Sequence, residues 1–334
     1  MTASLDSQDR INLGLDTLRE DDRPLVVCSV SGGKDSTAMA LHLRGFGLNF
    51  RCVFADTGWE HLDTYRYLRD TLDPMIGPID VVRIDGNLHS TRSELIVETA
   101  KDLPDSWEEI ERRAESRGMG GACLQKATFP SRLRRWCTEA LKIYPIKKYY
   151  QALGGDVVNA VGVRRAESRA RSLYPRWEYS SALKCDVWRP IIDWSAEDVV
   201  NLHARHGLAP NPLYLRGAER VGCWPCIFSR KSEVLMVARD TPQRIDLIER
   251  LELEVSALAS AKAEDRGAEG GAVRSFFPGC GPSDLGGKAG VMQIRKVVDW
   301  AETGRGGRQR ALFHDQPEGC VRWGLCEGSA GGAL

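Results

Sequence analysis

A loop with the sequence Ser-Gly-Gly-Lys-Asp-Ser-Thr combines several groups that bind phosphate. Its two glycines let the backbone approach an anion, and its lysine and hydroxyl groups can contact phosphate oxygens. A helix that starts inside the loop adds exposed N–H groups and the positive end of its dipole. The aspartate is unusual in an anion site and indicates either a bound magnesium ion or a structural bond to the loop. The predicted phosphate-binding residues are Ser31, Gly32, Gly33, Lys34, Asp35, Ser36 and Thr37.

The elements around this loop predict an α/β fold with a doubly wound, mainly parallel sheet. Apolar runs at 24–30, 49–58, 79–85 and 156–164 are typical of buried strands, and helical patterns alternate with them. The phosphate loop follows the first strand, at the carboxyl edge where ligands bind in such sheets. Helices are expected over 36–47, 60–72, 138–153 (with an interruption near Pro145), 195–207 and 242–264.

The chain divides into three predicted parts. A short helical or flexible segment covers residues 1–23, a nucleotide-binding domain covers 24–195, and a mostly helical, cysteine-bearing lobe covers 196–334. The 334 residues carry zero net charge, and no apolar run approaches the roughly 20 residues of a membrane span. The polar, acidic start of the chain does not look like a signal peptide. We therefore expect a cytoplasmic protein without a membrane partner.

Basic residues are concentrated between residues 126 and 176. Twelve Lys or Arg stand against three Asp or Glu in this segment, and aromatic residues lie among them. Such a segment is either an ordinary solvated surface or a site for polyphosphate or nucleic acid. Three of its arginines could make forked contacts with phosphate or sulfate, and a neighbouring glutamate could hold one of them in place. These residues are Arg164, Arg165, Arg171 and Glu167.

The ten cysteines would be reduced in the cytosol, so they are better explained as buried thiols, metal ligands or catalytic thiols than as disulfides. Cys28 and Cys52 lie in apolar strands and are expected in the core. Cys223 and Cys226 form a Cys-x-x-Cys pair, which can bind zinc, bind an iron–sulfur cluster or perform redox chemistry. The histidines show no pattern of metal ligands, and we expect His203 to be structural.

Five stretches within 24–228 resemble, in order, the motifs of the PP-loop ATP pyrophosphatases and the PAPS reductase superfamily. They are SGGKDS, FADTGWEHLDTY, RRWCTEALKIYPI with GVRRAESRARS, and NPLYLRGAERVGCWPC. The resemblance implies that Asp56 contacts the nucleotide or magnesium, although a turn or capping role is the alternative. It also implies that Arg135 and Lys142 face the nucleotide or an anionic substrate.

In cluster-bearing members of the superfamily, cysteines of the Trp-Cys-Thr region join the Cys-x-x-Cys pair. The resemblance thus implies that Cys137 ligates a 4Fe–4S cluster together with Cys223 and Cys226, while zinc and plain buried or redox thiols stay open as alternatives. A fourth ligand would come from Cys320 or Cys326, with Cys280 a weaker candidate.

PAPS and APS reductases have an altered loop and a catalytic Glu-Cys-Gly-x-His motif, whereas this chain has the full SGGKDS loop and no such motif. The combination is most similar to the DNA phosphorothioation ATP pyrophosphatases of the Dnd and Ssp type. It implies use of ATP and Mg²⁺ to adenylate a DNA backbone phosphate, with sulfur from a cysteine desulfurase and further sulfur-modification subunits as partners. The residues expected to act in catalysis are Lys34, Asp35, Asp56, Arg164 and Arg165.

Three other functions remain open at this stage. The chain could be a reductase of PAPS or APS, which would need a redox-active cysteine such as Cys326 near the nucleotide. It could modify tRNA instead of DNA. It could also be a subunit that binds nucleotide or nucleic acid without turning ATP over.

Overall fold

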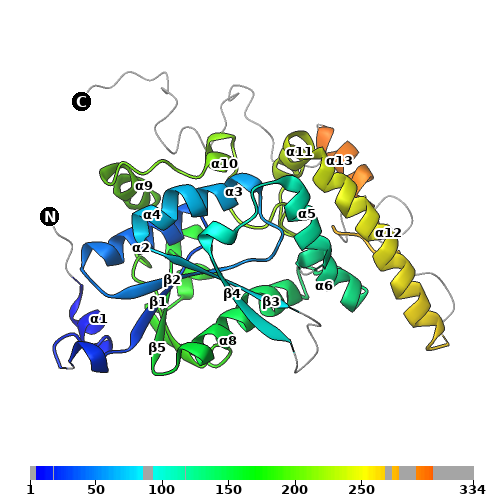
Figure 1. The fold of residues 1–334 in the computed structure, drawn as a ribbon. Coiled ribbons are helices and arrows are strands. Elements are labelled where there is room, and N and C mark those ends of the chain that lie inside the picture. The colour runs from blue at the N-terminus through cyan, green and yellow to red at the C-terminus, as the bar shows by residue number, and fades with distance from the viewer. Residues whose placement is uncertain are drawn as a thin grey trace, which may run out of the picture.

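A seven-stranded sheet with the strand order β4-β3-β2-β1-β5-β7-β6 forms the centre of the molecule (Figure 1). The structure is a computed structural model, and it describes residues 5–17, 19–85, 93–116, 118–267, 273–277 and 291–303. The strands are β1 (Leu25–Ser29), β2 (Phe50–Ala55), β3 (Ile79–Asp85), β4 (Glu94–Thr99), β5 (Val157–Val161), β6 (Trp177–Ser180) and β7 (Cys185–Trp188). The strand order changes direction between β1 and β5, and in doubly wound sheets a ligand site lies at that point.

The five inner strands run parallel, and the edge strands β4 and β6 are antiparallel to their neighbours. In β1, Val26 and Cys28 pack into one hydrophobic core while Val27 packs into another on the opposite face. Because both faces are covered, the strand is a continuous apolar run rather than an alternating one. Cys28 lies beside Cys52 of β2, and both are buried as expected. The predicted doubly wound, mainly parallel fold is confirmed.

Helices cover both faces of the sheet. Figure 1 shows α2 and α9 over one face and α8 under the other. The helices of the first part are α1 (Ser7–Asn12), α2 (Lys34–Gly45), α3 (Leu62–Arg66), α4 (Asp73–Ile76), α5 (Trp107–Ser116), α6 (Met119–Lys126), α7 (Trp136–Thr138) and α8 (Tyr144–Leu153). Those that follow are α9 (Ala196–Arg205), α10 (Pro212–Leu215), α11 (Lys231–Asp240), α12 (Pro242–Glu264) and α13 (Ile294–Glu302).

The sequence predicts an interruption near Pro145, but the helical segment from Trp136 to Leu153 continues through this residue. A π-helical segment, Glu139–Ile143, joins α7 to α8, and Pro145 stands in the first turn of α8. Proline is tolerated in a first turn, where its missing N–H is not needed. The winding therefore changes at this point while the chain continues as a helix. Single π-helical turns are frequent at functional sites, and this one carries Lys142.

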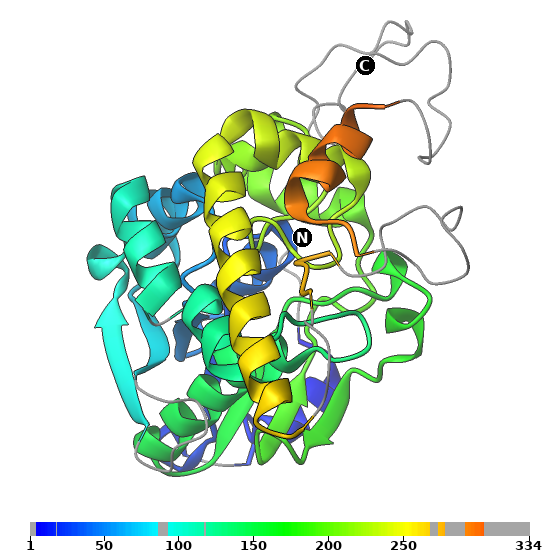
Figure 2. The same ribbon diagram turned by 90° about the vertical axis from the view of Figure 1, so that its right-hand side faces the viewer.

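The C-terminal helices build a second hydrophobic core beside the sheet. Helix α12 runs along α6, and α11 and α13 pack against it (Figure 2). Helix α9 instead packs on α2, and its Val199 and Leu202 belong to the core of the sheet. Ser195 caps α9 by accepting a hydrogen bond from the Asp198 N–H at 3.0 Å, at the start of the helix predicted over 195–207. In the part of the chain that the structure describes, no helix is long and apolar enough to span a bilayer.

His42 on α2 should make the fold sensitive to acid. Its ring contacts Phe46 and Trp194 edge-on, with centroids 4.5 and 4.7 Å away. Burial lowers the pKa of His42 from 6.5 to about 4, and the charges of Arg176 and Arg205 add to this effect. As the pH falls below about 6.5, the unfolded chain takes up the proton first, so the free energy of unfolding decreases until about pH 4.

We therefore expect wild type to lose about 2 kcal/mol more stability than His42→Gln between pH 7 and 4.5. Urea unfolding of both proteins at the two pH values measures this difference. His61, whose pKa also falls to about 4 because of burial, is present in both proteins and cancels. An equal loss of stability in the two proteins would contradict the assignment.

Candidate functional site

The phosphate loop joins the carboxyl end of β1 to the start of α2. Gly32 has a φ of +69°, which an L side chain rarely adopts, and Gly33 is the N-cap of α2. The Ser36 hydroxyl accepts a hydrogen bond from the Ser31 N–H at 3.2 Å and donates to the Gly33 carbonyl at 3.1 Å. Gly33, the N-cap of α2, has no side chain to cap the helix. Apart from the Lys34 N–H, which bonds to another side chain, the exposed N–H groups of this first turn can serve an anion, as expected of a phosphate site.

Residues from the distant C-terminal half hold this loop. The Asn211 amide donates to the Gly32 carbonyl at 3.3 Å, and the Tyr214 hydroxyl accepts from the Lys34 N–H at 3.1 Å. The Nε2 atom of His203 lies 3.0 Å from the Lys34 carbonyl oxygen. The ammonium group of Lys34 is 5.1 Å from the centre of the Tyr214 ring. The sequence motif Asn-Pro-Leu-Tyr thus has a physical role, because it fixes the backbone of the loop.

Asp35 is held by Arg164, which follows β5 on the neighbouring strand. The guanidinium donates from Nε to Asp35 Oδ1 at 2.5 Å, and Arg164 is almost fully buried. Lys34 Nζ is 3.6 Å from the other Asp35 oxygen. The Glu167 side chain accepts from the Arg164 N–H at 2.9 Å. The structure therefore brings these predicted residues together around one carboxylate.

The other two predicted arginines of this loop lie further out. Arg165 forms an ion pair with Asp193, and Arg171 forms one with Glu167. Arg135 is exposed, with its guanidinium 5.1 Å from the centre of the Phe228 ring. The neighbouring Arg132 contacts the same ring at 5.9 Å. Arg132 and Arg135 thus lie against Phe228, two residues after Cys226.

Gly162, the residue after β5, lies directly against the phosphate loop. A Cβ atom at this position would be 2.6 Å from both the carbonyl oxygen of Asp35 and the Cα atom of Ser36. Both of these are backbone atoms of the loop and helix. The absence of a side chain at Gly162 is thus a requirement for close packing of the two segments.

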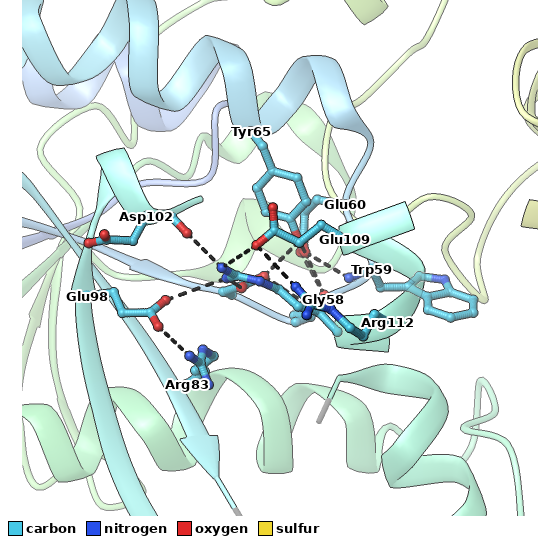
Figure 3. Close-up of polar contacts among 12 residues, drawn as sticks. Gly58, Trp59, Glu60, Tyr65, Arg83, Glu98, Asp102, Glu109 and Arg112 are labelled. Atoms are coloured by element: carbon cyan, nitrogen blue, oxygen red, sulfur yellow. Dashed lines mark hydrogen bonds and ion pairs between the residues drawn. The ribbon is translucent and has the colours of Figure 1, made fainter. Parts of the chain in front are cut away.

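Asp56 at the carboxyl end of β2 is engaged within its own turn. Its Oδ1 atom accepts from the Gly58 N–H at 2.8 Å and the Tyr65 hydroxyl at 2.7 Å, and its Oδ2 atom is 3.3 Å from Arg113. Figure 3 shows Tyr65 and Gly58 in this group, next to Glu60. These contacts match the turn role that the sequence leaves open for Asp56.

A cavity of about 140 Å³ lies between the phosphate loop, Glu60 and Lys142. Ser31 and Gly222 also line it, which places the loop and the residue before Cys223 on the same cavity. Glu60 is buried and bonded to the Thr57 hydroxyl at 2.8 Å. Burial and the nearby Asp56 raise the pKa of Glu60, while Lys142 opposes the shift. The cavity thus offers one acid and one cation beside the phosphate loop.

Sequence patterns do not single out Glu60. It lies between Asp56-Thr57-Gly58 and Asp63-Thr64, the residues that carry the resemblance in this stretch. Its role depends on contacts with distant segments, including a backbone bridge from Glu60 to Cys223. A buried carboxyl group in a cavity, with a raised pKa, is a candidate for proton transfer.

Cys223 and Cys226 stand on a loop pinned to the end of β2. The Trp224 N–H donates to the Trp59 carbonyl at 2.7 Å, and the Trp59 indole donates to the Pro225 carbonyl at 3.0 Å. The Thr57 hydroxyl is 3.9 Å from the Cys223 sulfur. Burial raises the pKa of Cys223 to about 12, partly offset by the ammonium group of Lys142. Conversely, the negative charges of nearby acidic groups raise the pKa of Lys142, whereas burial lowers it. These groups are the Cys223 thiol, the Glu60 carboxyl and the thiols of Cys226 and Cys137.

Cys137 on α7 lies close enough to Cys223 and Cys226 for their charges to affect one another, which the motif resemblance implies. Cys123 on α6 interacts with Cys137 in the same way and is buried, although no motif singles it out. Cys280, Cys320 and Cys326 lie outside the described residues. Among the residues that are described, no group of three or more His, Cys, Asp or Glu side chains is arranged to hold a single metal ion.

Arg244 on α12 is a buried cation without a hydrogen-bonding partner within the described ranges. Its guanidinium lies over the rings of Trp59 and Trp107, 4.3 and 5.7 Å from their centres. Burial lowers the pKa of Arg244 to about 10, and negative charge on Tyr65, Glu111, Glu60 and Cys223 opposes this. A buried charge is costly unless an opposite charge compensates it. Arg244 and Lys142 thus make the surroundings of Cys223 favourable for an anionic group.

Comparison with known proteins gives a consistent picture. Residues 25–229 match the family model of the phosphoadenosine phosphosulfate reductase domain. An uncharacterized 37.8 kDa protein of Escherichia phage 186 is 33% identical over 318 residues, which cover 86% of this chain and 91% of that protein. An adenosine 5'-phosphosulfate reductase of Anoxybacillus flavithermus is 27% identical over 197 residues, covering 54% of this chain and 72% of that enzyme.

Among solved structures, a phosphoadenylyl-sulfate reductase from Candida auris in a phosphate complex aligns with a TM-score of 0.41 and 16% identity. The alignment covers 66% of this chain and 97% of that one. The family model covers more than half of the chain and includes the phosphate loop, the Arg164 loop and the Cys-x-x-Cys pair. The chain therefore belongs to the phosphoadenosine phosphosulfate reductase domain family.

Proposed function

We propose that the protein cleaves ATP between its α and β phosphates and transfers AMP to a substrate phosphate, which then receives sulfur. The observation that carries this proposal is the cavity of about 140 Å³, whose lining includes Ser31 of the phosphate loop, Lys142 and Gly222 beside Cys223. A nucleotide phosphate and a sulfur-handling thiol could meet there.

The phosphate loop would bind and orient the triphosphate. The amino end of α2 and Lys34 attract the phosphate oxygens, and the hydroxyls of Ser31 and Thr37 can donate to them. Thr37 supports this use, because its buried hydroxyl has no hydrogen-bonding partner in the described part of the chain. Asp35 is the carboxylate on the loop that would hold Mg²⁺, which neutralises phosphate charge when bound. Asp56 would join it only if one of its present partners moved away.

The adenylation step makes a poor leaving group into a good one. An oxygen of the substrate phosphate attacks the α-phosphorus of ATP, and pyrophosphate leaves with the electron pair of the broken bond. A thiol reductant would first release the desulfurase's persulfide sulfur as sulfide, with formation of a disulfide. The sulfide then attacks the substrate phosphorus, and AMP leaves with the former oxygen and the electron pair of the broken bond. Arg164 would keep Asp35 in position, and Arg165 and Arg171 would bind the phosphates of the acceptor. Lys142 would stabilise negative charge in the cavity.

The same proposal assigns a 4Fe–4S cluster to Cys137, Cys223 and Cys226. The chemistry of the donor set supports such a group, because the thiols of Cys137, Cys223 and Cys226 pack against the same hydrophobic core, and Arg244 is a buried cation that lacks a hydrogen-bonding partner among the described residues. When bound, the cluster would carry or position the sulfur. Zinc remains the alternative occupant, although the described thiols are not arranged around one ion. Cys123 is the fourth ligand that we favour from its place beside Cys137.

DNA is the acceptor that we favour over tRNA. Arg132, Arg134 and Arg135 are exposed next to the Cys-x-x-Cys loop, and such groups bind backbone phosphates without reading the sequence. A cysteine desulfurase would supply the sulfur, and other sulfur-modification subunits would present the DNA. The proposal implies a cytoplasmic protein.

The non-enzymatic alternative is a subunit that binds a nucleotide or nucleic acid without turning ATP over.

Reduction of APS or PAPS is the second candidate, and it is favoured by one observation. Curated relatives of this chain, among them the enzyme of Anoxybacillus flavithermus, are named adenosine 5'-phosphosulfate reductases. That function would use a thiol near the nucleotide and would leave ATP intact.

Product analysis distinguishes the two candidates. We expect anaerobically purified protein with Mg²⁺, ATP, a DNA duplex and sulfide to release AMP and pyrophosphate in equal amounts. The parallel reaction with APS or PAPS and thioredoxin should release no sulfite. Chromatography of the nucleotides and a sulfite assay measure both. Release of ADP and phosphate from ATP would refute the proposal, and sulfite release would support the reductase instead.

A further inference from the structure

A second cavity, of about 410 Å³, lies outside the phosphate site. It is lined by Arg83 of β3 and by four residues of α5, namely Glu109, Arg112, Arg113 and Ser116. Among the residues that the structure describes, none of the phosphate loop and no cysteine belongs to this lining. Figure 3 shows Arg83 on the strand and Arg112 on the helix side of the space. Its volume is in the range of sites for small ligands.

Positive charge dominates the described part of the lining, which has three guanidinium groups and one carboxylate. Arg83 is mostly buried and pairs with Glu98 through Nη2, but its Nε and Nη1 atoms have no hydrogen-bonding partner in the described structure. Buried donors without acceptors are rare, since each one costs free energy. The Arg112 side chain is 77% exposed, and Glu109 is 4.0 Å away. Guanidinium groups therefore lie on both sides of the space.

Arg113 joins this cavity to the end of β2. Its Nη1 atom is 3.3 Å from Asp56 and 3.5 Å from Glu98, and its Nη2 atom is 3.1 Å from Glu109. Nη2 also donates to the carbonyl of Asp102 at 2.7 Å. These contacts fix the guanidinium in one orientation. Arg113 is thus a preorganised wall of the cavity, while Arg83 and Arg112 keep unused donors.

We propose that this cavity binds a phosphate group through Arg83 and Arg112. The planar guanidinium presents paired N–H donors that match the oxygens of a phosphate better than an ammonium group does. The ligand is a phosphate-bearing anion, either free or part of a nucleic-acid backbone. The site goes beyond the proposed function, because it lies apart from the nucleotide loop and needs no ATP cleavage.

The test measures anion binding in proteins that all carry Lys34→Ala, so that the phosphate loop contributes equally weakly. Binding of inorganic phosphate is measured by calorimetry, and binding of a fluorescent single-stranded 12-mer DNA by anisotropy at fixed salt. We expect Arg112→Ala to weaken binding about tenfold. Arg250→Ala is the matched control, because Arg250 is similarly exposed and pairs with Glu115 on the surface.

Loss of both phosphate and DNA binding in Arg112→Ala means that the cavity accepts free phosphate. Loss of DNA binding alone means that it holds a backbone phosphate. Either outcome supports the site, and Arg83→Met should repeat it if that protein folds. Affinities for both ligands within about twofold of the Arg250→Ala control would overturn the proposal.

Discussion

Replacement of Gly162 by alanine is expected to slow ATP cleavage by at least about 100-fold, because displacement of reacting groups by about 1 Å has effects of this size. The added Cβ would lie 2.6 Å from the carbonyl oxygen of Asp35 and from Cα of Ser36. Both are backbone atoms, so a side-chain rotation cannot relieve the contact. The loop and the start of α2 must shift away from β5, which moves Asp35 relative to Arg164.

Gly45→Ala is the matched control for this prediction. Gly45 ends α2, a Cβ atom added to it would meet no other atom within 4 Å, and its φ is not positive. Alanine is favoured over glycine in helices, so this variant should be as active as wild type and at least as stable. Release of pyrophosphate under saturating ATP, together with a thermal melt of each protein, measures the effects. Wild-type turnover in a folded Gly162→Ala protein would show that the packing is not needed.

Loss of bound iron is the second large effect that we expect. Serine at Cys137, Cys223 or Cys226 should reduce the iron and sulfide of anaerobically purified protein to below about a tenth of wild type, since a hydroxyl is a poor ligand compared with a thiolate. Cys123→Ser should have the same effect if Cys123 is the fourth ligand. Iron and sulfide assays, with the absorption spectrum, provide the measurement.

Cys185→Ser serves as the control, because Cys185 is buried at the start of β7 among the core residues under the sheet. Its protein should keep the cluster. Unchanged iron in Cys123→Ser, with loss in the other three variants, would move the fourth ligand to Cys280, Cys320 or Cys326. Stoichiometric zinc without iron or sulfide in wild type would contradict the cluster itself.

The inner strands can be predicted because their burial on both faces gives continuous apolar runs. Residues 79–85 form β3 as predicted, and the run at 24–30 contains β1. The sequence does not predict the edge strands β4 and β6. β4 is exposed on much of its surface, so its sequence Glu-Leu-Ile-Val-Glu-Thr has no covered face to reveal it. β7 has only four residues and follows a tight turn, which leaves too short a pattern to identify.

The phosphate loop is predictable because its residues are contiguous, and glycines, lysine and hydroxyls act together over seven positions. Glu60 and Arg244 are not, because their environment is made by segments far away in the sequence. Glu60 meets Cys223, and Arg244 meets Trp59. A glutamate on a turn and an arginine in the first turn of a helix are ordinary surface residues until the fold buries them. Cys123 likewise depends on the position of Cys137.

The contacts between the C-terminal half of the chain and the phosphate loop determine when the loop is supported during synthesis. The groups that contact Gly32 and Lys34 belong to His203, Asn211 and Tyr214, some 170 to 180 positions later in the chain. A nascent chain that has exposed only the strands β1 to β7 has the loop sequence without its supports. If the proposed function holds, the nucleotide loop would gain these supports only after Tyr214 leaves the ribosome.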